Sequence, residues 1–273
     1  LSLEYLEPIQ LVLYSTLFSI CILFILLLYQ GKLDLIKSVS KSDLKKYAFL
    51  GFLNPCLYYI ILFKAYDALP AQEAMVINFS WPVMLVILSI PILKQSLDFK
   101  SFLSIIVCYL GVVVIATNGD LFSMKFVNPF GVFLMLISTV IWSLFWLFNT
   151  KNSNDSVVSL FLIFLFNFPF ILAFVFLTNS FVIPSFKGLI GSIYIGFFEM
   201  GVSLVLWQSA LKISTTVSRV ASLVFITPFM SLVVLYFVLG ERILLSTFFG
   251  LVLICTGLIL QKYHTNKAIN DSS

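Results

Sequence analysis

The chain has 273 residues, of which 61% are hydrophobic and only 10% charged, and its mean hydropathy is +1.10. A soluble domain is nearer half apolar and a quarter charged, so this composition excludes a water-soluble protein and indicates one embedded in a lipid bilayer. The net charge of +4 is interpreted as a signal of membrane topology rather than as a nucleic-acid-binding surface.

Several segments are apolar enough, and long enough, to cross a bilayer as a helix, which takes about 20 residues. In chain order they are 8–29, 46–66, 71–93, 99–118, 129–149, 156–178, 187–211, 215–238 and 244–262. The connections between them are short, and the longest is a lysine-rich stretch at 30–45. The predicted fold class is all-α, a polytopic membrane helical bundle with nine spans.

The basic residues are unevenly distributed among the connections. With the stretch at 30–45 placed in the cytoplasm, twelve lysines and arginines lie on that side and four on the other. Because cytoplasmic loops carry an excess of Lys and Arg, we expect an inner (cytoplasmic) membrane protein with its N-terminus outside and its C-terminus in the cytoplasm.

The chain contains an internal repeat. Residues 71–114 match residues 146 positions further along without a gap, and a one-residue adjustment extends the match upstream. The informative pairs are Phe79 with Phe225, Pro82 with Pro228, Gly111 with Gly257 and, after the adjustment, Gly51 with Gly196. By the charge distribution the first set of helices starts inside and the second starts outside, so the halves are predicted to be inverted repeats.

The two repeats differ in their number of helices. We expect a first repeat over 1–118, a second over 129–263 and a polar cytoplasmic tail over 264–273. The second repeat has five helices and the first only four, so symmetry predicts an initial helix upstream of Leu1, the tenth of two five-helix repeats. The alternative is a native nine-helix protein.

Charged and amide side chains in mid-span are costly, so each is a candidate site residue. Glu199 lies at the centre of its helix and is interpreted as a site for a substrate amine or a proton. The alternative is a protonated structural carboxyl that bonds a neighbouring helix. Asn54 occupies the equivalent position in the first repeat, and Tyr58 follows it by one turn on the same face.

A second candidate group surrounds a proline. Asn78 and Trp81 are three residues apart, and Pro82 leaves a backbone carbonyl free, which predicts a kinked pocket wall; Pro228 is its partner in the repeat. The alternative for Asn78 is an amide bond between helices. Trp142 lies deep enough to face a cavity, whereas Trp146 and Trp207 are interpreted as interfacial anchors.

Two charges, Glu73 and Arg219, coincide under the 146-residue offset at the starts of matched helices on opposite faces of the membrane. They are candidate gates, although snorkelling side chains at helix ends are the plainer interpretation. The four cysteines lie in apolar runs, and the single histidine, His264, lies in the tail. Catalytic motifs are absent from the sequence, so we expect no enzyme activity, no cofactor and no metal site.

Three stretches resemble the EamA-type family of the drug/metabolite transporter superfamily: Ala68–Ala74, Phe79–Pro82 and Gly240–Arg242. The resemblance implies ten helices in two inverted five-helix repeats. The Asn78–Pro82 stretch resembles one in bacterial aromatic amino-acid exporters whose helix lines the central cavity, which implies a cavity role for Asn78, Phe79 and Trp81. Tyr58 and Trp142 correspond to aromatic positions of that family, and Phe79 replaces an expected tyrosine.

Together these features predict a secondary transporter that moves small metabolites, amino acids or related solutes, out of the cell by alternating access. The alternatives are a carrier of nucleotide-sugars or other polar metabolites, a passive channel, and a membrane enzyme that handles lipids. The expected partners are a small-molecule substrate and the lipid bilayer, with no nucleic acid, and the chain is expected to be a monomer or homodimer. Proton coupling, for which Glu199 is the candidate, is left open.

Overall fold

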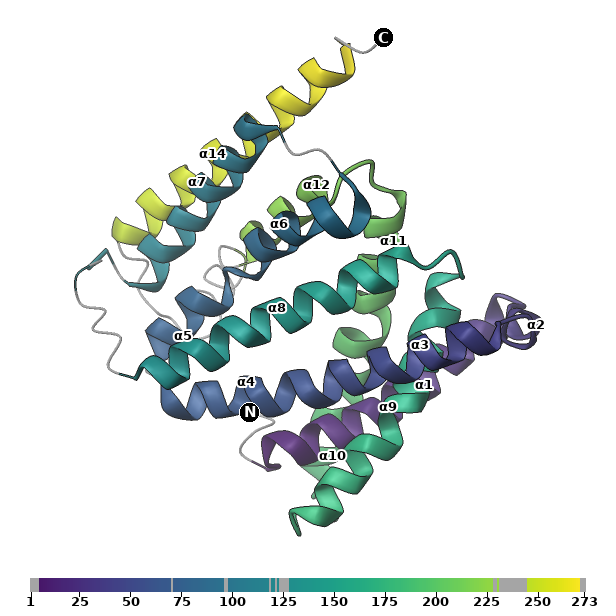
Figure 1. Ribbon diagram of the computed structural model, residues 1–273. Helices are drawn as coiled ribbons and strands as arrows, with labels where there is room; N and C mark the ends of the chain where they lie inside the picture. The colour runs from purple at the N-terminus through teal and green to yellow at the C-terminus, as the bar shows by residue number, and fades with distance from the viewer. Residues whose placement is uncertain are drawn as a thin grey trace. The chain divides into compact units, whose positions relative to one another are not determined.

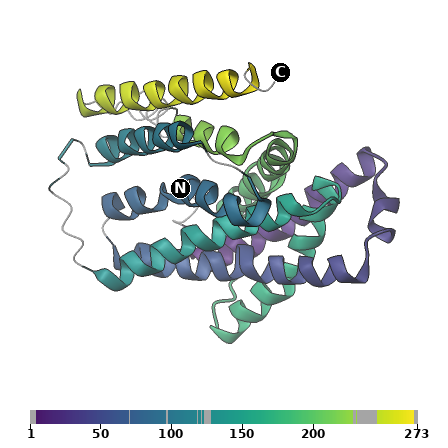
Figure 2. The same cartoon turned by 45° about the horizontal axis from the view of Figure 1, so that its top comes forward.

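The computed structural model describes residues 5–69, 71–95, 98–117, 119–120, 122, 128–227, 230 and 245–270. Every regular element in these ranges is a helix (Figures 1 and 2). The chain divides into two compact units, and each unit combines an early with a late segment. Unit 1 comprises Leu1–Phe63 and Phe148–Ile213, and unit 2 comprises Lys64–Leu147 and Ser214–Ser273.

The helices follow the apolar segments closely. Unit 1 contains α1 (Pro8–Tyr29), α2 (Leu33–Lys37), α3 (Lys41–Gly51), the π-helical η2 (Phe52–Leu57), α9 (Ser156–Leu177), α10 (Phe186–Tyr194), the π-helical η3 (Ile195–Ser203) and α11 (Leu204–Ile213). Unit 2 contains α5 (Ala71–Asn78), α6 (Trp81–Leu93), α7 (Phe99–Ala116), α12 (Val217–Leu223), the 3₁₀ turn η4 (Val224–Ile226) and α14 (Leu245–Asn270). Two helices, α4 (Tyr58–Ala68) and α8 (Pro129–Lys151), contribute residues to both units.

Among the described residues, six helical segments are long and apolar enough to cross a membrane, and three shorter helices are also apolar. These are the nine segments that the sequence predicts, so the polytopic helical membrane bundle is confirmed. Among the described boundaries, two differ from the predicted ones by five residues or more. A side-chain cap, Asp43 N to Ser40 Oγ at 3.0 Å, starts α3 five residues before the predicted span, and α14 continues as a helix through the predicted tail to Asn270.

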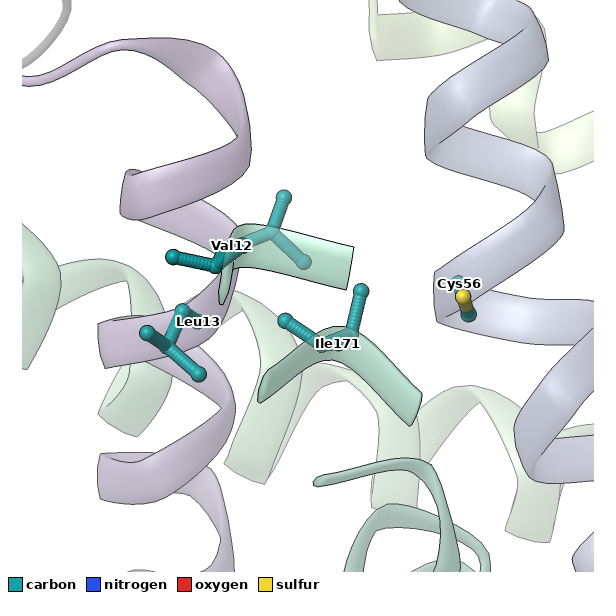
Figure 3. Close-up of a cluster of buried hydrophobic side chains, with 5 residues drawn as sticks. Val12, Leu13, Cys56 and Ile171 are labelled. Carbon is teal, nitrogen blue, oxygen red and sulfur yellow. The ribbon is translucent and has the colours of Figure 1, made fainter. Parts of the chain in front are cut away.

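In unit 1, α1 and α9 run antiparallel. Val12 and Leu13 near the start of α1 share a buried cluster with Ile171 and Val175 near the end of α9, and Cys56 of η2 completes it (Figure 3). At the opposite ends of the same two helices, the rings of Phe24 and Phe161 lie 5.9 Å apart.

The same two helices end in the same way. Gly31 follows α1 with a φ of 64° and Asn179 follows α9 with a φ of 52°, so both adopt the left-handed conformation that closes a helix. In each case the next residue donates its N–H five residues back, from Lys32 to the Leu27 carbonyl and from Ser180 to the Val175 carbonyl.

Glycines let helices from the two halves of the sequence approach closely. Each half contributes a glycine that contacts a helix of the other half. A Cβ atom on Gly51 would lie 2.6 Å from the carbonyl oxygen of Ile163 in α9. A Cβ atom on Gly196 would lie 2.5 Å from the carbonyl oxygen of Ser15 in α1. Gly51 and Gly196 are partners in the sequence repeat. The first contacts α9 and the second contacts α1, as expected if a twofold axis relates the two repeats.

Unit 2 shows the same kind of reciprocal glycine contact between α7 and α14, which lie side by side in both views (Figures 1 and 2). A Cβ on Gly111 would lie 2.5 Å from the Gly250 carbonyl oxygen, and one on Gly257 would lie 2.7 Å from the Ser104 carbonyl oxygen. Gly111 and Gly257 are repeat partners, and so are Ser104 and Gly250. The later residue of α7, Gly111, contacts the earlier residue of α14, Gly250, and the earlier Ser104 contacts the later Gly257. These equivalent helices therefore run antiparallel, the arrangement that inverted repeats require.

A polar network joins α3, α9 and the connection before α9 at one end of unit 1. The buried Tyr47 hydroxyl accepts hydrogen bonds from the amides of Asn152 at 2.6 Å and Asn154 at 2.8 Å. Asp155 caps α9 and accepts a hydrogen bond from Lys32 at 2.7 Å. Burial acts to raise the pKa of Asp155, but the hydrogen bonds from Lys32 and from two backbone N–H groups outweigh it, so this pKa lies below its usual range.

Candidate functional site

Two polar mid-span residues lie in π-helical turns at matching places in the repeats. Asn54 lies in η2 between α3 and α4, and Glu199 lies in η3 between α10 and α11. Inside η2 the backbone of Asn54 is extended, with φ −146° and ψ 127°. In η3 the carbonyl of Met200 accepts a hydrogen bond from the Ser19 hydroxyl of α1 at 3.0 Å. Short π-helical turns inside α-helices are frequent at functional sites, so these interruptions single out the pair.

The Glu199 side chain is exposed, and it makes no hydrogen bond or ion pair with any described residue. The described residues therefore provide no partner for the alternative interpretation, in which the Glu199 carboxyl bonds a neighbouring helix. A carboxyl group at mid-span almost always faces a water-filled cavity or the bundle interior, which favours contact with water, a proton or a cationic group.

Asn54 differs from Glu199 in being buried, with 2% of its surface exposed. Its Oδ1 atom accepts no hydrogen bond from the part of the chain that the structure describes. Tyr58 is also buried, one turn further along, and its ring lies edge-on to Tyr59 at 5.0 Å. Both residues belong to unit 1, as does Glu199.

Three further buried amides of unit 1 are not among the residues that the sequence selects. Asn149, Asn167 and Gln208 are completely buried, and none of the three amide groups forms a hydrogen bond with a described residue. Asn167 faces the close approach of Gly51, because a Cβ there would lie 3.0 Å from its backbone nitrogen. The sequence signal for Asn167 is an amide in mid-span, which the nearby Pro169 inside α9 also explains as part of a local helix kink. A buried unpaired amide costs about 1–3 kcal/mol, which makes all three residues candidates to contact water or cargo.

The aromatic candidates meet in unit 2. The rings of Trp81 and Trp142 lie 6.2 Å apart, edge to face, and both side chains are half-buried. The hydroxyl of Ser143 donates to the Trp81 carbonyl at 3.2 Å and joins α8 to the start of α6. Trp146 packs on Trp142 at 5.6 Å and is fully buried. The prediction that Trp146 anchors the chain at the membrane interface is therefore wrong, because its ring is enclosed by protein.

The Asn78–Pro82 stretch interrupts its span, as the proline predicts. Helix α5 ends at Asn78 and α6 begins at Trp81, with Pro82 buried at the second position of α6. Asn78 Nδ2 donates to the Tyr66 hydroxyl of α4 at 3.3 Å, which supports the alternative interpretation of an amide bond between helices. Phe79 lies at the break and is half-buried.

Of the two candidate gates, only the Arg219 side chain lies within the described structure. Arg219 donates to the Thr215 hydroxyl at 3.0 Å, a local contact at the start of α12. Glu73 lies in α5, but its side chain is outside the described structure, and Pro228 lies outside the described residues. Among the described side chains, no group of three His, Cys, Asp or Glu residues could hold a metal ion.

Comparison with known proteins identifies the family. The sequence model of the EamA-like transporter family matches residues 1–117 and 129–261. The chain belongs to the EamA-like transporter family. The two matched segments leave out only a short connection and the end of this EamA-like chain, and their limits fall close to the predicted repeats.

Relatives and a solved structure agree with this assignment. The EamA-like chain is 26% identical to an "Uncharacterized transporter" of Clostridium kluyveri, covering 97% of this chain and 86% of the relative. It is also 26% identical to an "Uncharacterized transporter" of Archaeoglobus fulgidus, covering 95% and 90%. A solved crystal structure that is 17% identical shares the fold with a TM-score of 0.81, over 96% of this chain and 90% of that one. The protein is therefore a multi-pass membrane transporter.

Proposed function

We propose that this EamA-like protein exports amino acids or closely related amphipathic metabolites across the inner membrane by alternating access. The observation that carries the proposal is Glu199, a mid-span carboxyl on a π-helical turn that is exposed and has no partner among the described residues. Such a group can bind a substrate ammonium or a proton, because either one compensates the cost of its charge inside a membrane.

Each unit also carries candidate contacts of its own for such a solute. In unit 1 the side chains of Asn54 and Tyr58 offer an amide and a phenol ring for hydrogen bonding and stacking. In unit 2 the Trp81–Trp142 pair offers aromatic faces, with Asn78 and Phe79 at the adjoining helix break. Ligand sites commonly combine apolar and aromatic walls with a few polar groups, which favours amphipathic cargo over phosphorylated sugars.

The proposed architecture is a pair of inverted repeats over 1–118 and 129–263, with 264–273 as the C-terminal segment. It is supported by the reciprocal glycine contacts and by the antiparallel pairing of α7 with α14. Inverted repeats support alternating access because the two repeats can exchange conformations across the membrane. We propose that the break before Pro82, and the matching Pro228, let their spans bend during this exchange.

An efflux screen tests the proposal. Proteoliposomes that contain the protein are loaded with an equimolar mixture of amino acids, and the external solution is assayed by mass spectrometry with and without an imposed pH gradient. We expect a subset of amino acids to leave faster than from protein-free liposomes. Equal efflux of every amino acid from both preparations would overturn the proposed substrate class, and a parallel nucleotide-sugar mixture tests the main alternative.

A further inference from the structure

We propose that unit 1 carries a second binding site, selective for a negatively charged phosphate group, in a cavity between α3 and the end of α8. The cavity has a volume of about 730 Å³. The residues that line it are Ser42, Lys45, Lys46, Phe49, Leu50, Phe148, Lys151 and Asn152. None of the residues that the sequence selects for cargo lies among them, so the site is distinct from the proposed cargo contacts.

The charged residues that line the cavity are all basic. Three of its lining residues are lysines, and none of the eight is acidic. Lys46 is paired with Asp43 at 2.8 Å, but Lys45 and Lys151 form no ion pair with any described residue. Two ammonium groups from different helices therefore converge on one space without a counter-charge. Lysine binds phosphate as a point charge, so an anionic phosphate would supply what these helices lack.

The lining of the cavity changes from polar to apolar side chains along α3. Along α3 the lining runs from Ser42, through Lys45 and Lys46, to Phe49 and Leu50, which spans about 12 Å of helix. Phe49 and Phe148 are 56% and 41% exposed, so their rings form an open apolar wall. A ligand that fits this lining has a charged group at one end and an apolar part at the other. An anionic phospholipid has that distribution, with a phosphate headgroup above its acyl chains.

The polar network behind the cavity keeps its wall in place. Asn152 donates to the buried Tyr47 hydroxyl at 2.6 Å, and that hydroxyl lies 3.0 Å from Ser159 Oγ of α9. The connection that carries Asn152 is therefore fixed to α3 and α9 before any ligand arrives. A site whose walls are already ordered binds at a lower entropic cost.

The location fits a membrane headgroup. The lysine excess predicts that this end of α3 faces the cytoplasm, and the anionic lipids of a cytoplasmic leaflet are attracted by basic residues near the surface. Basic pockets between spans on this side bind lipid headgroups in other membrane proteins. The inference uses the proposed orientation but does not depend on the proposed cargo.

Thermal stability tests the site with the full chain in nanodiscs. The discs contain either phosphatidylcholine alone or phosphatidylcholine with increasing phosphatidylglycerol, and a third series adds soluble glycerol phosphate to phosphatidylcholine discs. The variants are Lys45→Gln, Lys151→Gln and the double variant. The control, Lys41→Gln, removes a charge from the first turn of α3 outside the cavity. The variant Lys151→Arg keeps the charge.

We expect phosphatidylglycerol to stabilise the wild type, Lys41→Gln and Lys151→Arg at the same concentrations. Lys45→Gln and Lys151→Gln should each raise the half-saturating concentration about fivefold, which corresponds to about 1 kcal/mol per basic residue. Stabilisation by glycerol phosphate with the same dependence on Lys45 and Lys151 would assign the phosphate to a soluble ligand. If neither ligand stabilises the wild type, or if Lys41→Gln weakens the effect as much as the cavity variants do, the proposed site is wrong.

Discussion

A carboxyl group in the middle of a membrane span needs water, a counter-charge or a proton. Glu199 has no hydrogen bond or ion pair among the described residues, whereas two other acidic residues of unit 1 do: Asp155 bonds Lys32 and Asp43 bonds Lys46. Both of those carboxyl groups lie in connections or helix starts, where they contribute to capping. The contrast separates a structural use of acidic residues from the use proposed for Glu199.

The tryptophan pair can be tested by truncation. Trp81→Ala removes one ring of the edge-to-face pair with Trp142, and we expect transport of any cargo that stacks there to fall about five- to tenfold. This corresponds to about 1–1.5 kcal/mol, the value of an aromatic pair. The measurement is the initial efflux rate in proteoliposomes, and Trp81→Phe should restore part of the loss.

The control for this substitution is Phe130→Ala, which removes an aromatic ring that is 64% exposed at the start of α8. It should leave the efflux rate near that of the wild type. Equal rates for Trp81→Ala and wild type would mean that the tryptophan pair serves only packing.

At the scale of the element, small residues determine how closely the helices approach. Gly51 and Gly196 each lie against the backbone of a partner helix at a distance where no Cβ atom fits. The π-helical turns η2 and η3 begin at or beside these two glycines. The close approach therefore lies at the start of each interruption, and the interruption carries Asn54 or Glu199 away from regular helix geometry.

Alanine at either glycine should destabilise the fold. A Cβ atom 2.5–2.6 Å from a carbonyl oxygen forces the helices apart, and overpacking of this kind costs about 1–3 kcal/mol. We expect Gly51→Ala and Gly196→Ala to lower the melting temperature in detergent by similar amounts, since the two contacts are reciprocal. The matched control is Gly188→Ala, whose Cβ would meet side chains rather than backbone, those of Leu6 at 3.1 Å and Ser185 at 3.4 Å. A shift for the control as large as for the other two would contradict this account.

The spans were predictable and their interruptions were not. Apolar length alone predicts α1 and α9 to within one residue at each end, because burial in lipid depends on local composition. The π-helical turns depend on contacts between distant segments, such as Ser19 with Met200, which a single sequence does not display. For the same reason the lysines of the proposed phosphate cavity can be read from sequence as a topology signal but not as a cluster.

At the scale of the molecule, the charge distribution predicts which end of each span faces the cytoplasm. Single cysteines at Lys37 and Lys187, in a background without Cys21, Cys56, Cys108 and Cys255, test it through labelling with a membrane-impermeant maleimide. We expect Lys187→Cys to react in intact cells and Lys37→Cys only after the membrane is opened. The reverse pattern would invert the proposed orientation, and reaction of both in intact cells would contradict it.

The most direct test of the account compares Glu199→Gln with the wild type in proteoliposomes, using the cargo that the efflux screen identifies. The amide keeps the size of the side chain but can neither bind a proton nor pair with an ammonium. The control is Asp34→Asn, which changes an exposed acidic residue paired with Lys37 outside the spans. We predict that Glu199→Gln loses at least about tenfold in net flux, equivalent to about 1.4 kcal/mol, while Asp34→Asn transports normally. Wild-type flux through Glu199→Gln would contradict the central claim.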